Sequence, residues 1–331
     1  MIKLALIKIN LPDPQTKSMK IVITDGYTLN PGDLSWKAFD QLGEVIYFDR
    51  SSPEETLSRC REANVIITNK TPITGEIITS ATQLRLIAVT ATGYNVVDVA
   101  AAKKKNVPVC NVPVYGTDSV AQHTFALLLE LTNQVGKHTE SVRAGDWAKS
   151  PDWCYSKTPL VELRDKTIGI IGYGRIGHQV ANLARAFGMK VIFYDKSELP
   201  DADQVGSLEE LFTRSDVISV HCPLTTENTG FIDKKLLSTA KPGAFLINTS
   251  RGQLINETDL ASALQKGVIA GAALDVLSTE PPSANHPLTG LSNCIITPHM
   301  AWLSKEARTR IMETTFENVR LALAGKPRYV I

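Results

Sequence analysis

Residues 166–177, with the sequence KTIGIIGYGRIG, decide the fold of this chain. An apolar run from Ile168 to Ile171 is followed at once by glycines in the spacing Gly-x-Gly-x-x-Gly, and a helical pattern continues from Arg175 to Ala186. A strand, a glycine-rich turn and a helix in this order make the dinucleotide-binding unit of the Rossmann fold. Glycines also cluster by chance, so the strand before the motif and the helix after it carry the argument.

Each glycine of the motif has its own structural reason. Gly172 permits a tight turn, Gly174 lets the backbone approach a pyrophosphate, and Gly177 allows the helix to pack closely on the strand. The free amides and the partial positive charge at the start of the helix favour a bound phosphate. Arg175 is placed to add a phosphate contact, and we also predict cofactor contacts for Ile176.

The next apolar strand predicts which dinucleotide binds. It runs from Lys190 to Tyr194 and ends at Asp195, 23 residues after Gly172. A carboxylate at this place accepts hydrogen bonds from ribose hydroxyls and repels a 2′-phosphate. The neighbouring Lys196 offsets part of that repulsion. The sequence therefore predicts NAD as the cofactor rather than NADP.

The composition is that of an ordinary globular protein. The 331 residues, 43% apolar and 21% charged, suffice for about two domains of roughly 150 residues each. Lys and Arg number 35 against 34 Asp and Glu, and this net charge of +1 argues against nucleic-acid or membrane-surface partners. No apolar stretch approaches the ~20 residues that span a bilayer. The five cysteines are widely separated and form no CxxC pair, so we predict neither a disulfide framework nor a metal site, and a cytoplasmic location.

Short β-rich runs alternate with helical patterns along most of the chain. This alternation predicts βαβ units and parallel sheets, and hence an α/β protein. A long apolar helix over 118–136 and a polar stretch with tryptophans over 137–164 separate two series of strands. A final helix, about 303–324, lies beyond the second series. The predicted strands are 20–24, 44–48, 64–68, 86–89 and 107–110 in the first series and, after the glycine motif, 189–194, 216–220, 244–248, 269–274 and 294–296 in the second.

Three polar residues follow strands of the second series. Arg251 lies on a turn, and His299 comes just past a strand. Glu280 lies in a loop that Pro281 and Pro282 stiffen. Ligands of open α/β sheets bind outside the carboxyl ends of the strands, so all three side chains can face one crevice. Taken singly, each residue has an ordinary explanation as a surface ion pair or a solvated side chain.

Together these residue types suit a redox reaction at a carbonyl beside a carboxylate. Arginine binds a carboxylate bidentately and also polarises a carbonyl oxygen. Histidine transfers protons near neutral pH, and a neighbouring glutamate favours its charged form. A hydride from a nicotinamide and a proton from histidine convert a 2-oxo acid into a 2-hydroxy acid. We therefore predict that Arg251, Glu280 and His299 form the catalytic set.

The ordered motifs resemble those of one enzyme family. Besides the glycine motif, Asn-Thr-Ser-Arg-Gly at 248–252, the run from Asp-Val to Glu-Pro-Pro at 275–282 and Thr-Pro-His at 297–299 are similar to motifs of the NAD-dependent D-2-hydroxyacid dehydrogenases. The resemblance covers essentially the whole chain from Met19 on. Within that family, the segments 24–33 and 91–95 resemble bacterial glycerate dehydrogenases, also called hydroxypyruvate reductases, which interconvert hydroxypyruvate and D-glycerate.

The resemblance implies a role for each matching residue. Arg251 would bind the substrate carboxylate and carbonyl, with His299 as the acid/base and Glu280 as the partner of His299. The backbone amides of Thr92 and Gly93 would hold the substrate carboxylate. Further NAD contacts are implied for His221, Cys222, Pro223, Thr249 and Asp275, the last of them near the nicotinamide amide.

The resemblance also implies the architecture and the assembly. We expect two doubly wound parallel-sheet domains, a flavodoxin-like substrate domain and a Rossmann NAD domain, with a cleft between them. The substrate domain is placed at 19–117 plus 300–331 and the NAD domain at 118–299. Residues 1–18 stand before a complete first strand and are interpreted as an extension outside the fold. Members of the family are usually homodimers joined through the cofactor domain, so a homodimer is expected.

Several alternatives stay open on the sequence alone. The substrate can be another small 2-oxo acid, such as glyoxylate or pyruvate, because a single sequence does not shape the side-chain pocket. A non-catalytic NAD-sensing scaffold of the corepressor kind has the same fold, although the intact catalytic set favours an enzyme. His123 is interpreted as buried near the hinge, and core or dimer packing is the default role of Trp147, Trp153 and Tyr155.

Overall fold

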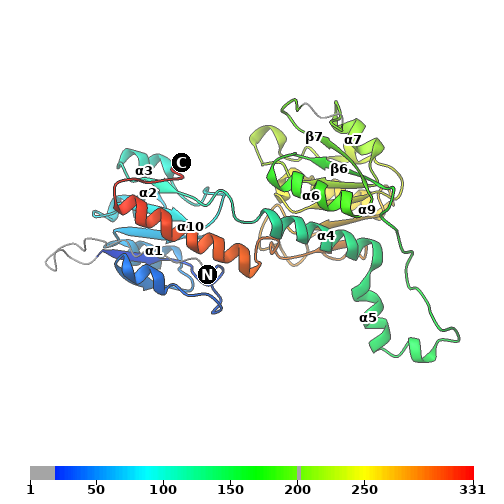
Figure 1. Ribbon diagram of the computed structural model, residues 1–331, viewed down its shortest axis with the longest axis horizontal. Helices are drawn as coiled ribbons and strands as arrows, with labels where there is room; N and C mark the ends of the chain where they lie inside the picture. Colours follow the sequence, from blue (N-terminus) through cyan, green and yellow to red (C-terminus); the bar gives the residue numbers. More distant parts are fainter. Residues whose placement is uncertain (1–18, 200–202) are drawn as a thin grey trace, which may run out of the picture. The chain divides into compact units, whose positions relative to one another are not determined.

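Figure 1 shows a computed structural model of the chain, which describes residues 19–199 and 203–331. The predicted extension, residues 1–18, lies outside the described residues. Throughout the described chain, helices alternate with strands that pair in parallel within two separate sheets. The predicted fold class is therefore confirmed.

The chain divides into two compact units. Gly116–Ser304 form one unit, and Lys305–Ile331 join the residues up to Tyr115 in the other. The chain therefore crosses between the units after Tyr115 and after Ser304, whereas the sequence placed the domain boundaries after residues 117 and 299.

In the unit that combines the residues up to Tyr115 with Lys305–Ile331, the described residues form a five-stranded sheet in the order β2-β1-β3-β4-β5. This order is that of flavodoxin-like folds. Helix α10 returns from the end of the chain and packs against β4. The strands are β1 Lys20–Ile23, β2 Glu44–Tyr47, β3 Val65–Thr68, β4 Leu86–Val89 and β5 Val109–Cys110, and the helices are η1 Lys37–Gln41, α1 Pro53–Cys60, α2 Gly75–Ser80, α3 Val99–Lys104 and α10 Lys305–Leu323.

The described part of Gly116–Ser304 forms a six-stranded sheet in the order β11-β10-β9-β8-β6-β7. Its strands are β6 Thr167–Ile171, β7 Lys190–Tyr194, β8 Val217–Val220, β9 Phe245–Asn248, β10 Gly271–Leu274 and β11 Cys294–Ile296. Its helices are α4 Thr117–Asn133, α5 Val135–Arg143, η2 Trp147–Lys149, α6 Arg175–Ala186, α7 Leu208–Arg214, η3 Thr226–Asn228, α8 Lys234–Leu237, η4 Gly252–Leu254 and α9 Glu257–Gln265. Strand β6 lies between β8 and β7. The strand that follows β6 in the chain, β7, is added on one side of it, and the next strand, β8, is added on the other side. Dinucleotides bind at such a switch point in strand order.

Both faces of this six-stranded sheet are buried. Ile170 and Ile247 belong to a core on one face, which includes α4 and α6 residues. Their neighbours Ile171 and Leu246 belong to a core on the other face, which includes α7 and α9 residues. Because successive side chains of a strand point to opposite faces, a strand buried on both sides must be apolar throughout. This explains why the strands were readable as continuous apolar runs.

The predicted helix over 118–136 is wrong in its extent. Helix α4 ends at Asn133, and a second helix, α5, begins at Val135 and continues to Arg143, into the stretch from residue 137 on that the sequence assigned to a polar connection. Gln134 between them has a φ of 45°, in the left-handed region, and its amide donates to the Glu130 carbonyl. The Glu130 carboxylate accepts the Gly136 amide at 3.2 Å. In Figure 1, α5 and the segment after it extend away from the rest of their unit.

In the part of the chain that the structure describes, no helix is long and apolar enough to cross a membrane.

Candidate functional site

The glycine motif has the geometry that its three glycines predict. Gly172 has a φ of +90°, and a Cβ there would lie 2.5 Å from the Cys222 amide nitrogen. A Cβ on Gly177 would lie 2.3 Å from the Gly172 carbonyl oxygen. Beside Gly174, by contrast, no heavy atom of the described residues comes within 4 Å of a Cβ position. Two glycines therefore allow close packing within the chain, and the middle one leaves room at the start of α6 for a phosphate group.

Asp195 lies where the sequence predicts it, directly after β7. Its Oδ2 accepts a hydrogen bond from the Tyr173 amide at 2.8 Å, and its Oδ1 accepts one from the Ser197 amide at 3.0 Å. Tyr173 is a residue of the glycine-rich turn, so this carboxylate ties the end of β7 to that turn. The sequence did not indicate this second task for Asp195, because it depends on how two separate strand ends meet.

The loop after β8 supplies the next predicted cofactor residues. Burial lowers the pKa of His221 to about 3, and its Nε2 lies 2.8 Å from the Ser219 hydroxyl. Burial also raises the pKa of the Cys222 thiol to about 11. Both side chains are therefore neutral at physiological pH, and Pro223 beside them is exposed. A neutral lining suits contact with an uncharged part of a cofactor.

The turn after β9 presents Arg251. The buried Asn248 side chain holds this turn, since its Nδ2 donates to the Arg251 carbonyl at 2.8 Å and its Oδ1 accepts the Ser250 amide at 2.9 Å. The Arg251 side chain is exposed. Thr249, in the same turn, is buried, and its hydroxyl lies 3.1 Å from that of Thr124 on α4.

Gly252 is a structural requirement that the sequence did not single out. A Cβ at this residue would lie 1.9 Å from the Leu277 carbonyl carbon, so only glycine fits without a backbone shift. This contact brings the Arg251 turn against the segment that leads to Glu280. The motif Asn-Thr-Ser-Arg-Gly was visible in the sequence, but the neighbour that its glycine touches was not.

His299 and Glu280 form a direct pair. His299 Nδ1 lies 2.6 Å from Glu280 Oε2, and the two side chains are 30% and 37% exposed. The other carboxylate oxygen of Glu280 accepts the Leu277 amide at 3.0 Å, which fixes its orientation. Because Nδ1 faces the carboxylate, Nε2 is the imidazole nitrogen that remains for a substrate.

Asp275 is 1% exposed and holds the turn that carries His299. Its carboxylate accepts the Thr297 hydroxyl at 2.6 Å and the amides of Met300 and Ala301 at 2.9 and 2.8 Å. Burial raises the pKa of this carboxyl group, but hydrogen bonds from His123, Thr297 and these amides outweigh burial, and the pKa lies below its ordinary value. The carboxylate is therefore ionised at neutral pH.

The predicted residues of Gly116–Ser304 share one edge of the sheet. The glycine motif, Asp195, the His221 loop, the Arg251 turn, Asp275 and His299 follow β6, β7, β8, β9, β10 and β11 in turn. Since the strands are parallel, all of these groups lie at the carboxyl edge. Thr92 and Gly93 follow β4 in the other unit, where the Thr92 carbonyl accepts the Asn111 side-chain amide at 2.8 Å.

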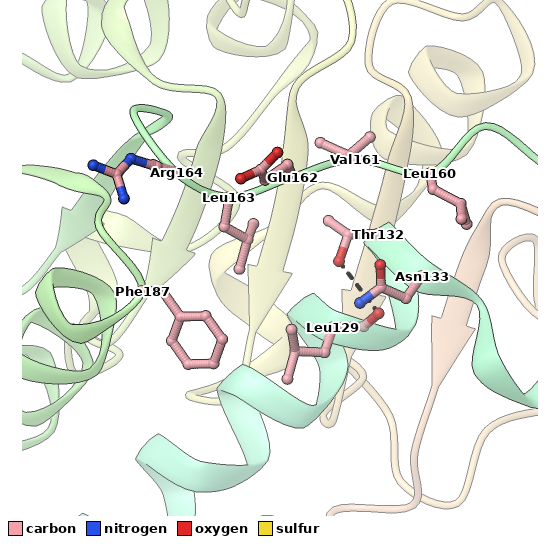
Figure 2. A pocket seen from close by; sticks show the side chains of 9 residues that line it. All are labelled: Leu129, Thr132, Asn133, Leu160, Val161, Glu162, Leu163, Arg164 and Phe187. Carbon is pink, nitrogen blue, oxygen red and sulfur yellow. Dashed lines mark hydrogen bonds between the residues drawn. The ribbon is translucent and has the colours of Figure 1, made fainter.

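A cavity of about 490 Å³ lies elsewhere in the unit Gly116–Ser304, and Figure 2 shows its lining. It is formed by Leu129, Thr132 and Asn133 at the end of α4, by residues 160–164, and by Phe187 after α6. Residues 160–164 precede β6, so the cavity lies toward the amino edge of the sheet and includes none of the predicted site residues. Within residues 19–199 and 203–331, no group of three or more His, Cys, Asp or Glu side chains is arranged to hold a metal ion.

Comparison with known proteins gives consistent results. Residues 125–301 match the family model described as D-isomer specific 2-hydroxyacid dehydrogenase, NAD binding domain. A hydroxypyruvate reductase from Blautia hydrogenotrophica is 48% identical over 320 residues, which are 95% of this chain and 99% of that protein. A glycerate dehydrogenase from Methylorubrum extorquens is 40% identical over 282 residues, 85% of this chain and 89% of that protein.

Among solved structures, an acyclic imino acid reductase in complex with NADPH and D-Arg is similar, with a TM-score of 0.82 and 37% identity. The match covers 95% of this chain and 100% of that one.

Proposed function

The chain belongs to the D-isomer specific 2-hydroxyacid dehydrogenases, and we propose that within this family it interconverts hydroxypyruvate and D-glycerate with NAD(H). The observation that carries the proposal is the His299–Glu280 pair, 2.6 Å apart, on the same sheet edge as Arg251 and the glycine motif. The names of the two relatives, a hydroxypyruvate reductase and a glycerate dehydrogenase, support this choice of substrate.

The residues on this edge fit a bound dinucleotide. The open space beside Gly174 admits a pyrophosphate at the start of α6, and the Asp195 carboxylate suits ribose hydroxyls. When bound, NADH supplies the hydride. We assign the other cofactor contacts to Gly172, Arg175, Ile176, Gly177, His221, Cys222, Pro223, Thr249 and Asp275.

Side chains of the protein itself perform the remaining steps, which are substrate binding and proton transfer. Arg251 binds the carboxylate of the 2-oxo acid through its guanidinium and polarises the adjacent carbonyl. Protonated His299 donates its Nε2 proton to the carbonyl oxygen, and Glu280 stabilises the charged imidazole through Nδ1. Hydroxypyruvate, one hydride and one proton give glycerate. We assign the unit that combines the residues up to Tyr115 with Lys305–Ile331 as the substrate domain, and there the amides of Thr92 and Gly93 bind the substrate carboxylate.

Initial rates of NADH oxidation with hydroxypyruvate, glyoxylate and pyruvate test the substrate. We expect the highest kcat/KM with hydroxypyruvate. A higher value with either other acid would contradict the substrate assignment, and no turnover with any of them would favour an NAD-sensing scaffold. His299→Asn should lower kcat roughly 10²–10⁴-fold while NADH still binds, because the amide cannot deliver a proton. Arg251→Lys should weaken substrate binding, because an ammonium cannot form the bidentate contact.

A homodimer joined through the NAD domain is also part of the proposal. Large apolar side chains of α5 and the segment after it are exposed, among them Val135, Trp147, Trp153 and Leu160. Exposed apolar surface of this kind is typical of protein interfaces. Light scattering should give twice the monomer mass, and a monomer would contradict the assignment. The five cysteines are free, in keeping with the cytoplasmic location that we assign.

A further inference from the structure

A shielded hydrogen-bond chain links helix α4 to the turn that carries His299. His123 Nε2 lies 3.1 Å from the Thr297 hydroxyl oxygen and 3.4 Å from Asp275 Oδ1. The Thr297 hydroxyl donates to the same Asp275 oxygen at 2.6 Å. The side chains of His123 and Asp275 are 17% and 1% exposed. These three side chains come from segments more than 20 residues apart and meet beneath the turn.

Counting hydrogens fixes which atom donates at each link. The ionised Asp275 carboxylate has no hydrogen and only accepts. The Thr297 hydroxyl has a single hydrogen, which it gives to Asp275. Its oxygen can therefore only accept from the third member, so the hydrogen between Thr297 and His123 must be carried by His123 Nε2. Each hydrogen bond is therefore donated in the same direction, from His123 to Thr297 and from Thr297 to Asp275.

Asp275 in turn fixes both sides of His299. Its carboxylate accepts the amides of Met300 and Ala301, and its main-chain carbonyl accepts the His299 amide at 2.8 Å. His299 has a φ of 51°, in the left-handed region that few residues with side chains adopt. Such a conformation persists only where surrounding bonds hold it. A rotation of the Asp275 carboxylate would release these amides and displace the imidazole from Glu280.

Helix α4 contacts this turn at two places. Ser119 lies one helical turn before His123, so both side chains point from the same face of the helix. The Ser119 hydroxyl donates to the Ala301 carbonyl at 2.6 Å, while His123 reaches Thr297. Thr297 and Ala301, the first and last residues of the segment 297–301, are thus both hydrogen-bonded to helix α4, and His299 lies between them.

We propose that His123 is a positioning residue for His299: its Nε2–H, through the Thr297 hydroxyl, fixes the Asp275 carboxylate and with it the turn that presents the His299 imidazole. The expected effect on turnover rests on the proposed function, whereas the position of the hydrogen on His123 follows from the hydrogen bonds alone.

Two pairs of variants test this role. His123→Leu and Thr297→Val lack the required hydrogen-bonding group, whereas His123→Gln and Thr297→Ser keep it. We expect kcat for hydroxypyruvate to fall about 10- to 100-fold in the first pair, since a displacement of about 1 Å at a reacting group costs up to about 10²-fold. The second pair should remain within about threefold of the unchanged protein. NADH affinity, measured by fluorescence, should change less than about twofold in the second pair, and in the first pair it should fall by less than kcat, because Asp275 is also assigned a cofactor contact.

His138→Gln is the matched control, because it removes a histidine from α5 and should leave kcat unchanged. Equal losses of kcat in His123→Gln and His123→Leu would overturn the proposal. So would a Thr297→Val protein whose melting temperature falls while its kcat does not, since that is the signature of a merely structural role. If His123→Leu fails to fold, the Thr297 pair decides.

Nuclear magnetic resonance provides a readout that does not depend on turnover. Long-range proton–nitrogen spectra of the chain with ¹⁵N-labelled histidine report which ring nitrogen carries a hydrogen, and the signals missing in His123→Gln identify His123. We expect a hydrogen on Nε2, and an Nε2 without one would overturn the proposal. If the protein reduces no 2-oxo acid, the proposed function is refuted instead. The spectrum would still show whether His123 Nε2 carries the hydrogen.

Discussion

Asp195 should make NADH the preferred cofactor over NADPH. Its carboxylate is held by the Tyr173 and Ser197 amides, so it stays beside the glycine-rich turn where a ribose is expected. A 2′-phosphate carries about −1.5 to −2 charges. At a separation of about 5 Å, Coulomb's law gives a repulsion of about 1.5 kcal/mol in bulk water and about 6 kcal/mol at an effective dielectric constant of about 20.

The partial exposure of Asp195 places the repulsion in the lower part of this range. Solvent screens exposed charges, so we take about 1–3 kcal/mol, which corresponds to a preference of roughly 5- to 150-fold in kcat/KM. Lys196, which is exposed beside it, offsets part of the repulsion, so Lys196→Ala should increase the preference.

Two variants separate the charge of Asp195 from its hydrogen bond. Asp195→Asn keeps an oxygen that can accept the Tyr173 amide but removes the charge, so the ratio of the two kcat/KM values should fall toward one while catalysis with NADH persists. Asp195→Ala also removes the acceptor and should lower kcat/KM with both cofactors, because the glycine-rich turn loses a contact. The assay is the initial rate of hydroxypyruvate reduction with each cofactor. Equal use of both cofactors by the unchanged protein, or an unchanged ratio in Asp195→Asn, would refute the reasoning.

Three further changes have defined outcomes. Gly252→Ala should lower the melting temperature by several degrees, because a Cβ placed 1.9 Å from the Leu277 carbonyl carbon forces a backbone shift that costs about 1–3 kcal/mol. Gly290→Ala, where a Cβ meets no atom of the described residues within 4 Å, is the control, and equal losses would contradict the argument. His221, with a folded-state pKa of about 3 against ~6.5 when unfolded, should make the fold less stable as pH falls below ~6.5, since only the unfolded chain then takes up the proton. Because His221 is partly exposed, we expect His221→Gln to remove about 1 kcal/mol of the stability lost between pH 7 and 5 in urea unfolding, and an identical pH dependence in both proteins would disprove this. Deletion of residues 1–18 should leave kcat unchanged, because β1 begins at Lys20, and a large loss of activity would contradict it.

Local sequence patterns were sufficient for the fold, and they also provide most of the residues that we propose for the site. Strands buried on both faces are apolar throughout, so their positions could be read directly, and the glycine motif combines a strand, a turn and a helix within 12 consecutive residues. The parallel arrangement then places the residue after each strand at one edge. That rule alone predicts that Arg251 and His299 lie on the edge that carries the glycine motif.

The tertiary structure decided the contacts between segments that are distant in the chain. The approach of Gly252 to Leu277 and the bond from the Tyr173 amide to Asp195 each join the ends of different strands. His123 lies in a helix whose pattern gives it no distinctive role, and it reaches Thr297 because α4 packs beside β9 and β10. Helix α4 likewise ends at Asn133 with Gln134, rather than a glycine or proline, in the position directly after it. A hydrogen bond depends on a few ångströms between two side chains, and that distance is set by packing rather than by the residues on either side in sequence.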